Sequence, residues 1–193
     1  MPTPELFAAK VSALGIDNEQ RVVVYDVYGM QSAARTWWMF RVFGHDNVSV
    51  LNGGLPKWEA EERPITAETK LRAVTNFAAG FRPELVRGID DVRAVVEDGG
   101  AQIVDARAIG RFTAIEPEPR PGMRSGHMPG AINLPFTELL DPAFREFKDT
   151  ATILDRVQAA NIDLSQPVIT SCGSGVTACA VSLALFLAGK EDA

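Results

Sequence analysis

The chain is poor in cysteine and histidine, with two of each among its 193 residues. Cys172 and Cys179 both lie near the end of the sequence, so they do not form the disulfide framework of a small secreted protein. The two histidines are distant from the cysteines, which leaves no metal-ligand spacing. We therefore expect no metal site and a reducing environment, most simply the cytoplasm.

A secretory leader, a long apolar run and a basic excess are also lacking. Met1 is followed by Pro-Thr-Pro-Glu, with no basic and then apolar segment. The longest apolar stretch, 176–188, contains threonine, cysteine and serine and is too short to span a bilayer. The formal net charge is −6, which disfavours nucleic-acid binding. We expect a soluble protein with neither a membrane nor a nucleic-acid partner.

Short β-branched runs alternate with apolar segments of helical type along most of the chain. This alternation predicts the α/β class, an open parallel sheet flanked by helices, rather than a sandwich. The expected strands are 21–26, 48–51, 101–107, 131–135 and 168–171. The expected helices are 5–14, 32–44, 52–61, 89–98, two pieces within 142–160, and 177–188. Residues 112–130 are rich in proline and glycine and predict a long loop.

Two segments of the chain resemble each other, 22–44 and 167–189, and both read as strand, glycine loop, apolar helix and closing glycine. In this alignment Asp26 stands opposite Cys172. The similarity predicts two tandem α/β modules, the first lacking its front and the second its last strand. Incomplete sheets would expose edges, so self-association is a further expectation. The predicted divisions are 1–66, a linker over 67–86, and 87–193.

The segment PVITSCGSGVT, residues 167–177, places Cys172 at the end of an expected strand. Ligands of parallel α/β sheets bind at such strand ends. The loop amides could curl around the sulfur, lower its pKa and stabilise an anion. The alternative, a buried and inert cysteine, is disfavoured by the glycine loop and its position. The residues expected to form this amide nest are Gly173, Ser174, Gly175, Val176 and Thr177.

The residues near Cys172 limit the classes of reaction that it could catalyse. A phosphatase-type cysteine needs an arginine six residues on, but that position is Ala178 and the loop has no Lys or Arg. We interpret Cys179 as a small residue of the core. We interpret His127 as a residue whose hydrogen bonds hold a turn, rather than as a catalytic base. Positive charge for a substrate carboxylate could come from the loop that follows the 101–107 strand. Its arginines are Arg107, Arg111, Arg120 and Arg124.

Several motifs together resemble the catalytic module of the tandem-rhodanese sulfurtransferases. They are DAR (105–107), GRF (110–112), EPEPR (116–120), SGHMPGAINLP (125–135) and CGSGVT (172–177). Residues 22–58 are similar to the latter half of the non-catalytic first module of that family, where an aspartate commonly replaces the cysteine. The neutral loop CGSGVT resembles that of the 3-mercaptopyruvate sulfurtransferases in particular. The resemblance implies the rhodanese fold, in two tandem modules.

The resemblance also implies a reaction. Cys172 would take sulfane sulfur from 3-mercaptopyruvate or thiosulfate as a persulfide, stabilised by the amides of the 173–177 loop. A thiol acceptor such as thioredoxin or a small thiol, or cyanide in assays, would then remove the sulfur. By motif match Arg111 and Arg120 would bind the donor, and Ser174 would assist proton transfer. No metal or organic cofactor is implied.

One part of the family pattern has no counterpart here. In the 3-mercaptopyruvate enzymes a histidine and an aspartate from the front of the first module complete a relay with the serine. We expect that front to be missing from this chain, and His45 belongs to a different motif. The alternative function is therefore a catalytically impaired, rhodanese-like binding or regulatory fragment.

Overall fold

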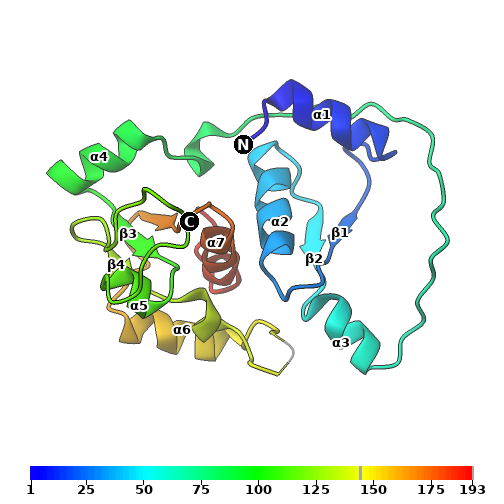
Figure 1. Ribbon diagram of the computed structural model, residues 1–193. Helices are drawn as coiled ribbons and strands as arrows, with labels where there is room; N and C mark the ends of the chain where they lie inside the picture. Colours follow the sequence, from blue (N-terminus) through cyan, green and yellow to red (C-terminus); the bar gives the residue numbers. More distant parts are fainter. Residues whose placement is uncertain (144, 193) are drawn as a thin grey trace.

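The computed structural model of the protein describes residues 1–143 and 145–192, and within these it contains two parallel sheets flanked by helices (Figure 1). The first sheet pairs β1 with β2, and the second has the order β4-β3-β5. The strands are β1 (Val22–Val24), β2 (Val48–Val50), β3 (Gln102–Asp105), β4 (Ile132–Asn133) and β5 (Val168–Ser171). Each lies inside a predicted strand, and the α/β class is confirmed.

The helices flank these sheets, and most follow the predicted segments. They are α1 (Pro4–Ala13), α2 (Ser32–Val42), α3 (Gly54–Ala60), α4 (Ile89–Asp98), α5 (Ile109–Phe112), α6 (Thr150–Ala159) and α7 (Thr177–Leu187), with 3-10 turns at η1 (Pro83–Leu85) and η2 (Phe136–Leu139). We refer to β1, β2 and α1–α3 as the first module, and to β3–β5 and α4–α7 as the second.

Two features of the second module differ from the prediction. The short helix α5 was not expected, and among the described residues of 142–160 only one of the two predicted helical pieces is present, as α6. Before α6, the amide of Ala143 donates to the Asp141 carboxylate at 2.8 Å. Leu140 also pairs with Phe147 in an antiparallel bridge. An aspartate that binds the amide two residues on favours a turn, which competes with a helix at that point.

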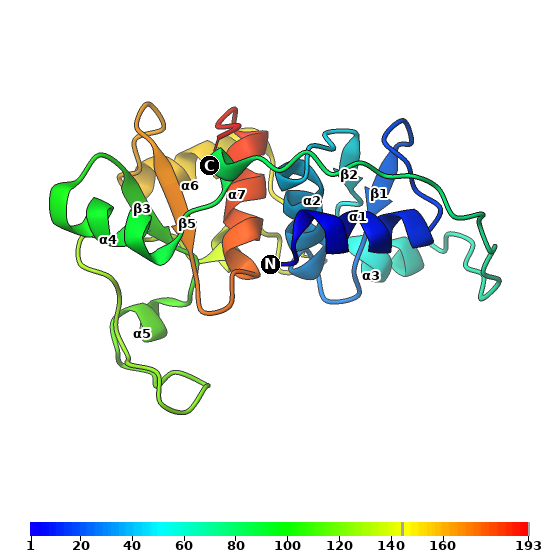
Figure 2. The same cartoon turned by 90° about the horizontal axis from the view of Figure 1, so that it is seen from above.

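Helices α2 and α7 lie side by side between the two sheets (Figure 2). Helix α7 is apolar on all sides, and every residue from Ala178 to Leu185 is buried. Such a helix needs partners around its whole circumference. Its own sheet covers one side and α2 another, where the ring of Trp37 meets that of Phe186 edge-on at 5.2 Å. The two modules therefore share one hydrophobic core.

The segment between α3 and η1 has two distinct parts. Residues 61–74 are exposed, without helix or strand, and run along the outside of the first module (Figure 1). Residues 75–82 turn back onto α1, where the amide of Phe77 donates to the hydroxyl of Ser12 at 2.9 Å. The ring of Phe77 is buried against Phe7, with centroids 5.8 Å apart. Burial of this aromatic ring fixes the second part of the segment.

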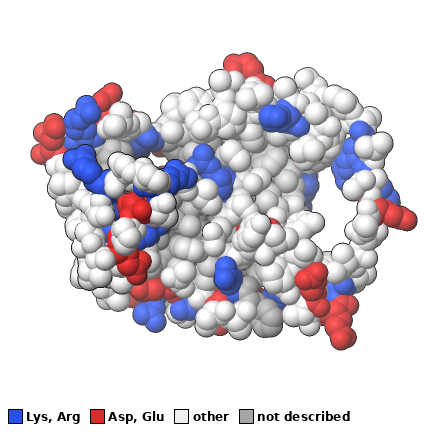
Figure 3. All heavy atoms as spheres, in the orientation of Figure 1, with Lys and Arg blue, Asp and Glu red and all other residues white. Residues whose placement is uncertain are grey.

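The surface shows mixed charge. On the face in Figure 3, acidic and basic side chains are interspersed, and no broad patch of one sign covers it. Across the residues described, no helix is long and apolar enough to cross a membrane. The same residues contain no group of three or more His, Cys, Asp or Glu side chains placed to hold a metal ion.

Candidate functional site

The carboxyl ends of the second sheet's strands meet at one edge, where Cys172 directly follows β5. The β5–α7 loop and the arm formed by α5 and residues 113–127 project from the same side of the molecule (Figure 2). An open cavity of about 480 Å³ lies at this edge. Its lining includes Ser171 and Cys172 at the end of β5, Asp105 and Arg107 at the end of β3, and Arg124 and His127 from the arm. This is the expected ligand position of an open α/β sheet.

The loop after Cys172 curls around its sulfur. The amide of Gly175 donates to Sγ at 3.0 Å. Gly175 has φ of +70°, a left-handed conformation that favours glycine. Burial raises the pKa of the Cys172 thiol, but the Thr177 hydroxyl and the amides of Ser174, Ala178 and Gly175 together lower it further than burial raises it. The net effect is a pKa below the ordinary thiol value, which favours the nucleophilic thiolate.

This arrangement predicts the reactivity of Cys172. Alkylation by iodoacetamide should show an apparent pKa below the value of about 8.5 for a free cysteine. Thr177→Val removes one donor, so the pKa should rise and alkylation at pH 7 should slow by roughly 3- to 10-fold. The measurement is the alkylation rate against pH, with the modified peptide identified by mass spectrometry. Thr66→Val, at an exposed position, is the control. An unchanged rate in Thr177→Val would contradict this account.

The second cysteine has a different environment. Cys179 is buried, and burial raises the pKa of its thiol to about 11. Its S–H donates to the carbonyl of Gly175 at 3.1 Å. At neutral pH it is therefore protonated and sheltered, so alkylation reports Cys172 alone.

A chain of partly buried ion pairs lies beside the cysteine loop. The carboxylate of Glu118, only 2% exposed, accepts from Arg107 Nη1 at 2.7 Å and from Arg111 Nη2 at 2.6 Å. Arg107 also binds Asp105, at the end of β3, through Nη2 at 2.5 Å. The hydrogen bond from Arg111, with a further contribution from Arg107, lowers the pKa of Glu118, and burial raises it by less. The carboxyl group therefore stays ionised. The arm is thereby tied to the sheet by charge-assisted bonds.

This network brings Arg111 to the cysteine loop. A Cβ built on Gly173 would lie 2.9 Å from Arg111 Nη2, so a side chain at this position would displace the guanidinium from where it lies. Arg111 thus lies next to the residue that follows Cys172, with its orientation set by Glu118. A guanidinium held in this way can bind a substrate carboxylate or carbonyl.

Glu118→Gln keeps the side-chain shape but removes the charge that orients Arg111. If Arg111 binds a sulfur donor, kcat/KM for that donor should fall by about 10- to 100-fold because its positioning is lost. Glu116→Gln is the matched control, since Glu116 lies two residues earlier and is exposed. That control should change kcat/KM by less than about twofold. Equal effects of the two substitutions would show that the Glu118 bridge does not matter.

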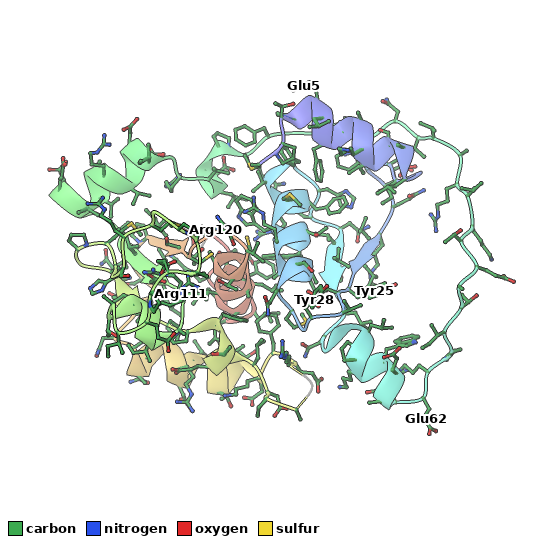
Figure 4. All side chains as sticks on the ribbon, in the orientation of Figure 1. Glu5, Tyr25, Tyr28, Glu62, Arg111 and Arg120 are labelled. Carbon is green, nitrogen blue, oxygen red and sulfur yellow. The ribbon has the colours of Figure 1, made fainter. Side chains whose placement is uncertain are left out.

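The other predicted site residues take varied positions. Arg111 and Arg120 both lie on the side of the second sheet (Figure 4). Arg120 is exposed and, within the described ranges, has no ion-pair partner. Ser174 is exposed on the loop, and Val176 is the residue that precedes the first turn of α7. Arg111 therefore lies against the cysteine loop at Gly173.

Sequence reasoning did not identify Glu118 as a site residue. Its only signal was the EPEPR motif, and proline-rich segments carry no periodicity from which burial can be predicted. His127 lies at the cavity, but its Nδ1 is 2.7 Å from the carbonyl of Phe112 and its ring stacks on the Phe112 ring at 3.7 Å. These contacts fit the interpretation of His127 as a residue that holds the arm.

The first module contains a matching loop around a different anion. The carboxylate of Asp26, 7% exposed, accepts from the amides of Gly29 and Ala33, each at 2.9 Å. It also accepts from the Ser32 hydroxyl at 3.1 Å and from the Tyr28 amide at 3.2 Å. Burial raises the pKa of Asp26, but these donors together lower it below the ordinary value. The nest that holds sulfur in one module holds a fixed carboxylate in the other.

The chain is similar to a known domain family and to several named proteins. The family model described as "Rhodanese-like domain" matches residues 1–61 and 89–192. A human protein named 3-mercaptopyruvate sulfurtransferase is 42% identical over 194 residues, covering all of this chain and 65% of the relative. A bovine protein named thiosulfate sulfurtransferase is 41% identical over 195 residues, with the same coverage.

A solved structure agrees with the sequence relatives. The crystal structure of SseA from Escherichia coli, described as a 3-mercaptopyruvate sulfotransferase with the rhodanese fold, superposes with a TM-score of 0.88 at 37% identity. The match covers 100% of this chain and 71% of SseA. The chain spans 65% of the length of the human and bovine relatives.

Proposed function

Because the chain belongs to the rhodanese family, we propose that it is a sulfurtransferase in which Cys172 carries sulfane sulfur from 3-mercaptopyruvate to a thiol acceptor. The observation that supports this is the loop around Cys172, in which hydrogen-bond donors surround Sγ and lower its pKa. Such a loop stabilises a thiolate and also the anionic persulfide that replaces it.

In the first step the Cys172 thiolate attacks the sulfur of the donor. A sulfur–sulfur bond forms as the carbon–sulfur bond of 3-mercaptopyruvate breaks, and its electron pair passes to carbon as the pyruvate enolate. The donor's thiol proton then reaches that carbon, which gives pyruvate and a deprotonated Cys172 persulfide. The position of the Arg111 guanidinium beside Gly173 supports a role for Arg111 in binding the donor carboxylate.

In the second step a thiolate attacks the outer sulfur of the persulfide. The sulfur–sulfur bond breaks, Cys172 leaves as the thiolate, and the acceptor becomes a persulfide. Small thiols and thioredoxin are the acceptors proposed, with cyanide as an assay substitute. The open cavity at Cys172 gives such acceptors a route to the sulfur.

The charges around the cysteine favour a monoanionic donor. The loop 172–177 has no Lys or Arg, and the charges of Arg107 and Arg111 are balanced by Asp105 and Glu118. Arg124 at the cavity and Arg35 behind the loop add positive charge, but neither belongs to the loop itself. A loop without its own basic residue suits the monoanion 3-mercaptopyruvate better than the dianion thiosulfate. Sequence identity does not show which donor this chain prefers, because the human and bovine relatives are 42% and 41% identical to it but are named for different donors.

The test combines product and intermediate. The protein is incubated with 3-mercaptopyruvate and, separately, with thiosulfate, and pyruvate, thiocyanate and the intact mass are measured. We expect one added sulfur atom on the Cys172 peptide, pyruvate release, and a higher kcat/KM for 3-mercaptopyruvate. No added sulfur and no pyruvate would overturn the proposal and favour a non-catalytic, rhodanese-like binding protein. A higher kcat/KM for thiosulfate would overturn the choice of donor only.

A further inference from the structure

An arginine of the first module reaches the cysteine loop of the second. Arg35, on α2, donates from Nη1 to the carbonyl of Gly175 at 2.9 Å, although the two residues are 140 positions apart in the chain. The same nitrogen lies 3.9 Å from Cys179 Sγ. The guanidinium also stacks over the ring of Trp38, at 4.6 Å from its centroid. These contacts fix the side chain of Arg35 against the loop.

The carbonyl that Arg35 binds belongs to Gly175, the residue whose amide donates to the Cys172 sulfur. Gly175 donates its amide to Cys172 Sγ at 3.0 Å, and its carbonyl is held by both Arg35 and the Cys179 S–H. A Cβ on Gly175 would lie 3.0 Å from Arg35 Nη1, so the guanidinium packs closely against the glycine. Holding the carbonyl fixes the left-handed conformation of Gly175, and with it the direction of its amide.

Arg35 approaches from behind the loop rather than from the substrate side. It lines a cavity of about 350 Å³ together with Gly175, Ala178 and Cys179, and Cys172 is not among the residues that line it. Cys172 faces the other cavity, which Arg35 does not line. Arg35 therefore touches the support of the sulfur site and not the place where a donor would bind.

We propose that Arg35 is a positioning residue for the Cys172 loop, so that contact between the two modules sets the ability of the second to stabilise a sulfur anion. The proposal rests on the proposed function for the role of that anion as a sulfur carrier. The charged groups that face the loop are Arg35 at Gly175, and Arg111 with Glu118 at Gly173. The cavity behind the loop adds Glu84, Arg87 and Asp192. The cavity in front adds Asp105, Arg107, Arg124 and His127. Among these, Arg35 is the group contributed by the first module.

Arg35→Met tests the inference by removing the donor while keeping an extended apolar side chain over Trp38. The carbonyl of Gly175 then loses its stronger partner and the loop loosens, so the Cys172 thiolate is less stabilised. Alkylation of Cys172 at pH 7 should slow by roughly 3- to 10-fold, with its pH profile moved to higher pH. This readout needs no catalytic turnover, so it is distinct from any failure of the proposed function.

Arg41→Met is the matched control. Arg41 is also on α2 and also contacts the second module, since its guanidinium lies 4.4 Å from the Phe186 ring and donates to the Glu191 carbonyl at 3.2 Å. Its loss should lower stability but leave the alkylation profile of Cys172 unchanged. If Arg41→Met slows alkylation as much as Arg35→Met does, the effect is a general loosening of the interface and the inference fails.

The sulfur-transfer reaction provides a second readout. If the chain is active, Arg35→Met should lower kcat with little change in KM, because Arg35 does not line the donor cavity. Should Arg35→Met not fold by circular dichroism, Arg35→Gln decides, since the glutamine side chain is uncharged and ends two atoms short of the position of Nη1, the donor to the Gly175 carbonyl. Slower alkylation in a folded Arg35→Gln protein supports the inference. Wild-type alkylation in either folded variant overturns it.

Discussion

Replacing Cys172 by serine is expected to abolish sulfur transfer while leaving the fold intact. A serine hydroxyl is not ionised at neutral pH and cannot hold sulfane sulfur, so pyruvate release from 3-mercaptopyruvate should fall by at least about 1,000-fold. The same loop donors can still bind the serine oxygen, which preserves the conformation of Gly175. Steady-state assays and circular dichroism on the Cys172→Ser protein check both parts of this expectation.

The comparison with Glu118→Gln makes this result interpretable. That variant retains Cys172 and should retain its persulfide, only formed more slowly. The Cys172→Ser protein should gain no sulfur at any donor concentration, as measured by intact mass. Pyruvate release at more than a few per cent of the wild-type rate would mean that another group carries the reaction, and the assignment of Cys172 would be wrong.

Asp26→Asn is expected to have the largest effect on stability. The carboxylate is buried and accepts from amides on both sides of the β1–α2 turn and from the Ser32 hydroxyl. Asparagine loses the charge and points its NH₂ group at some of these donors, which are left unpaired. The free energy of unfolding should drop by about 2–4 kcal/mol in urea titrations at pH 7. Asp155→Asn, on the exposed face of α6, should change it by less than about 0.5 kcal/mol.

The effect of Asp26 should depend on pH with a definite sign. Its folded pKa lies below the unfolded value of about 3.9. The stabilisation is therefore present above about pH 4 and is lost as the pH falls through the folded pKa. The difference between wild type and Asp26→Asn should narrow in acid, where the wild-type side chain is also neutral. A difference that stays constant down to pH 2 would show that the carboxylate charge is not what stabilises the turn.

The parts of the fold that sequence reasoning predicted are those determined by local pattern. The β-branched run 168–171 predicted a buried strand, and the apolar segment after it predicted a buried helix. Cys172 follows the first and precedes the second, so its position at the end of β5 could be predicted. The similarity of residues 22–44 to 167–189 likewise anticipated the matching loops around Asp26 and Cys172.

The parts that it did not predict depend on contacts between distant residues or on very short elements. Arg35 is 140 positions from the carbonyl that it binds, and the sequence of α2 predicts only a helix that packs in the core. Glu118 lies in a segment whose prolines remove periodicity, so its burial leaves no signal in the sequence. Helix α5 precedes those prolines, but its four residues are too few to show a helical period. Arg111 and Arg120 matched the family motifs equally well, but only Arg111 has a buried partner that holds it beside Gly173.

The covalent connection between the two modules and the forces that hold them together are separate features of this molecule. Residues 61–74 are exposed throughout, whereas the modules are joined by the Trp37–Phe186 contact and the Arg35 bond to Gly175. A protease that cuts within 61–74 would therefore leave the two fragments associated, with the cysteine loop still supported from α2. Since closure of a flexible loop depends only weakly on its length, insertions there should also be tolerated. The polypeptide could be split at this stretch and reassembled from two chains.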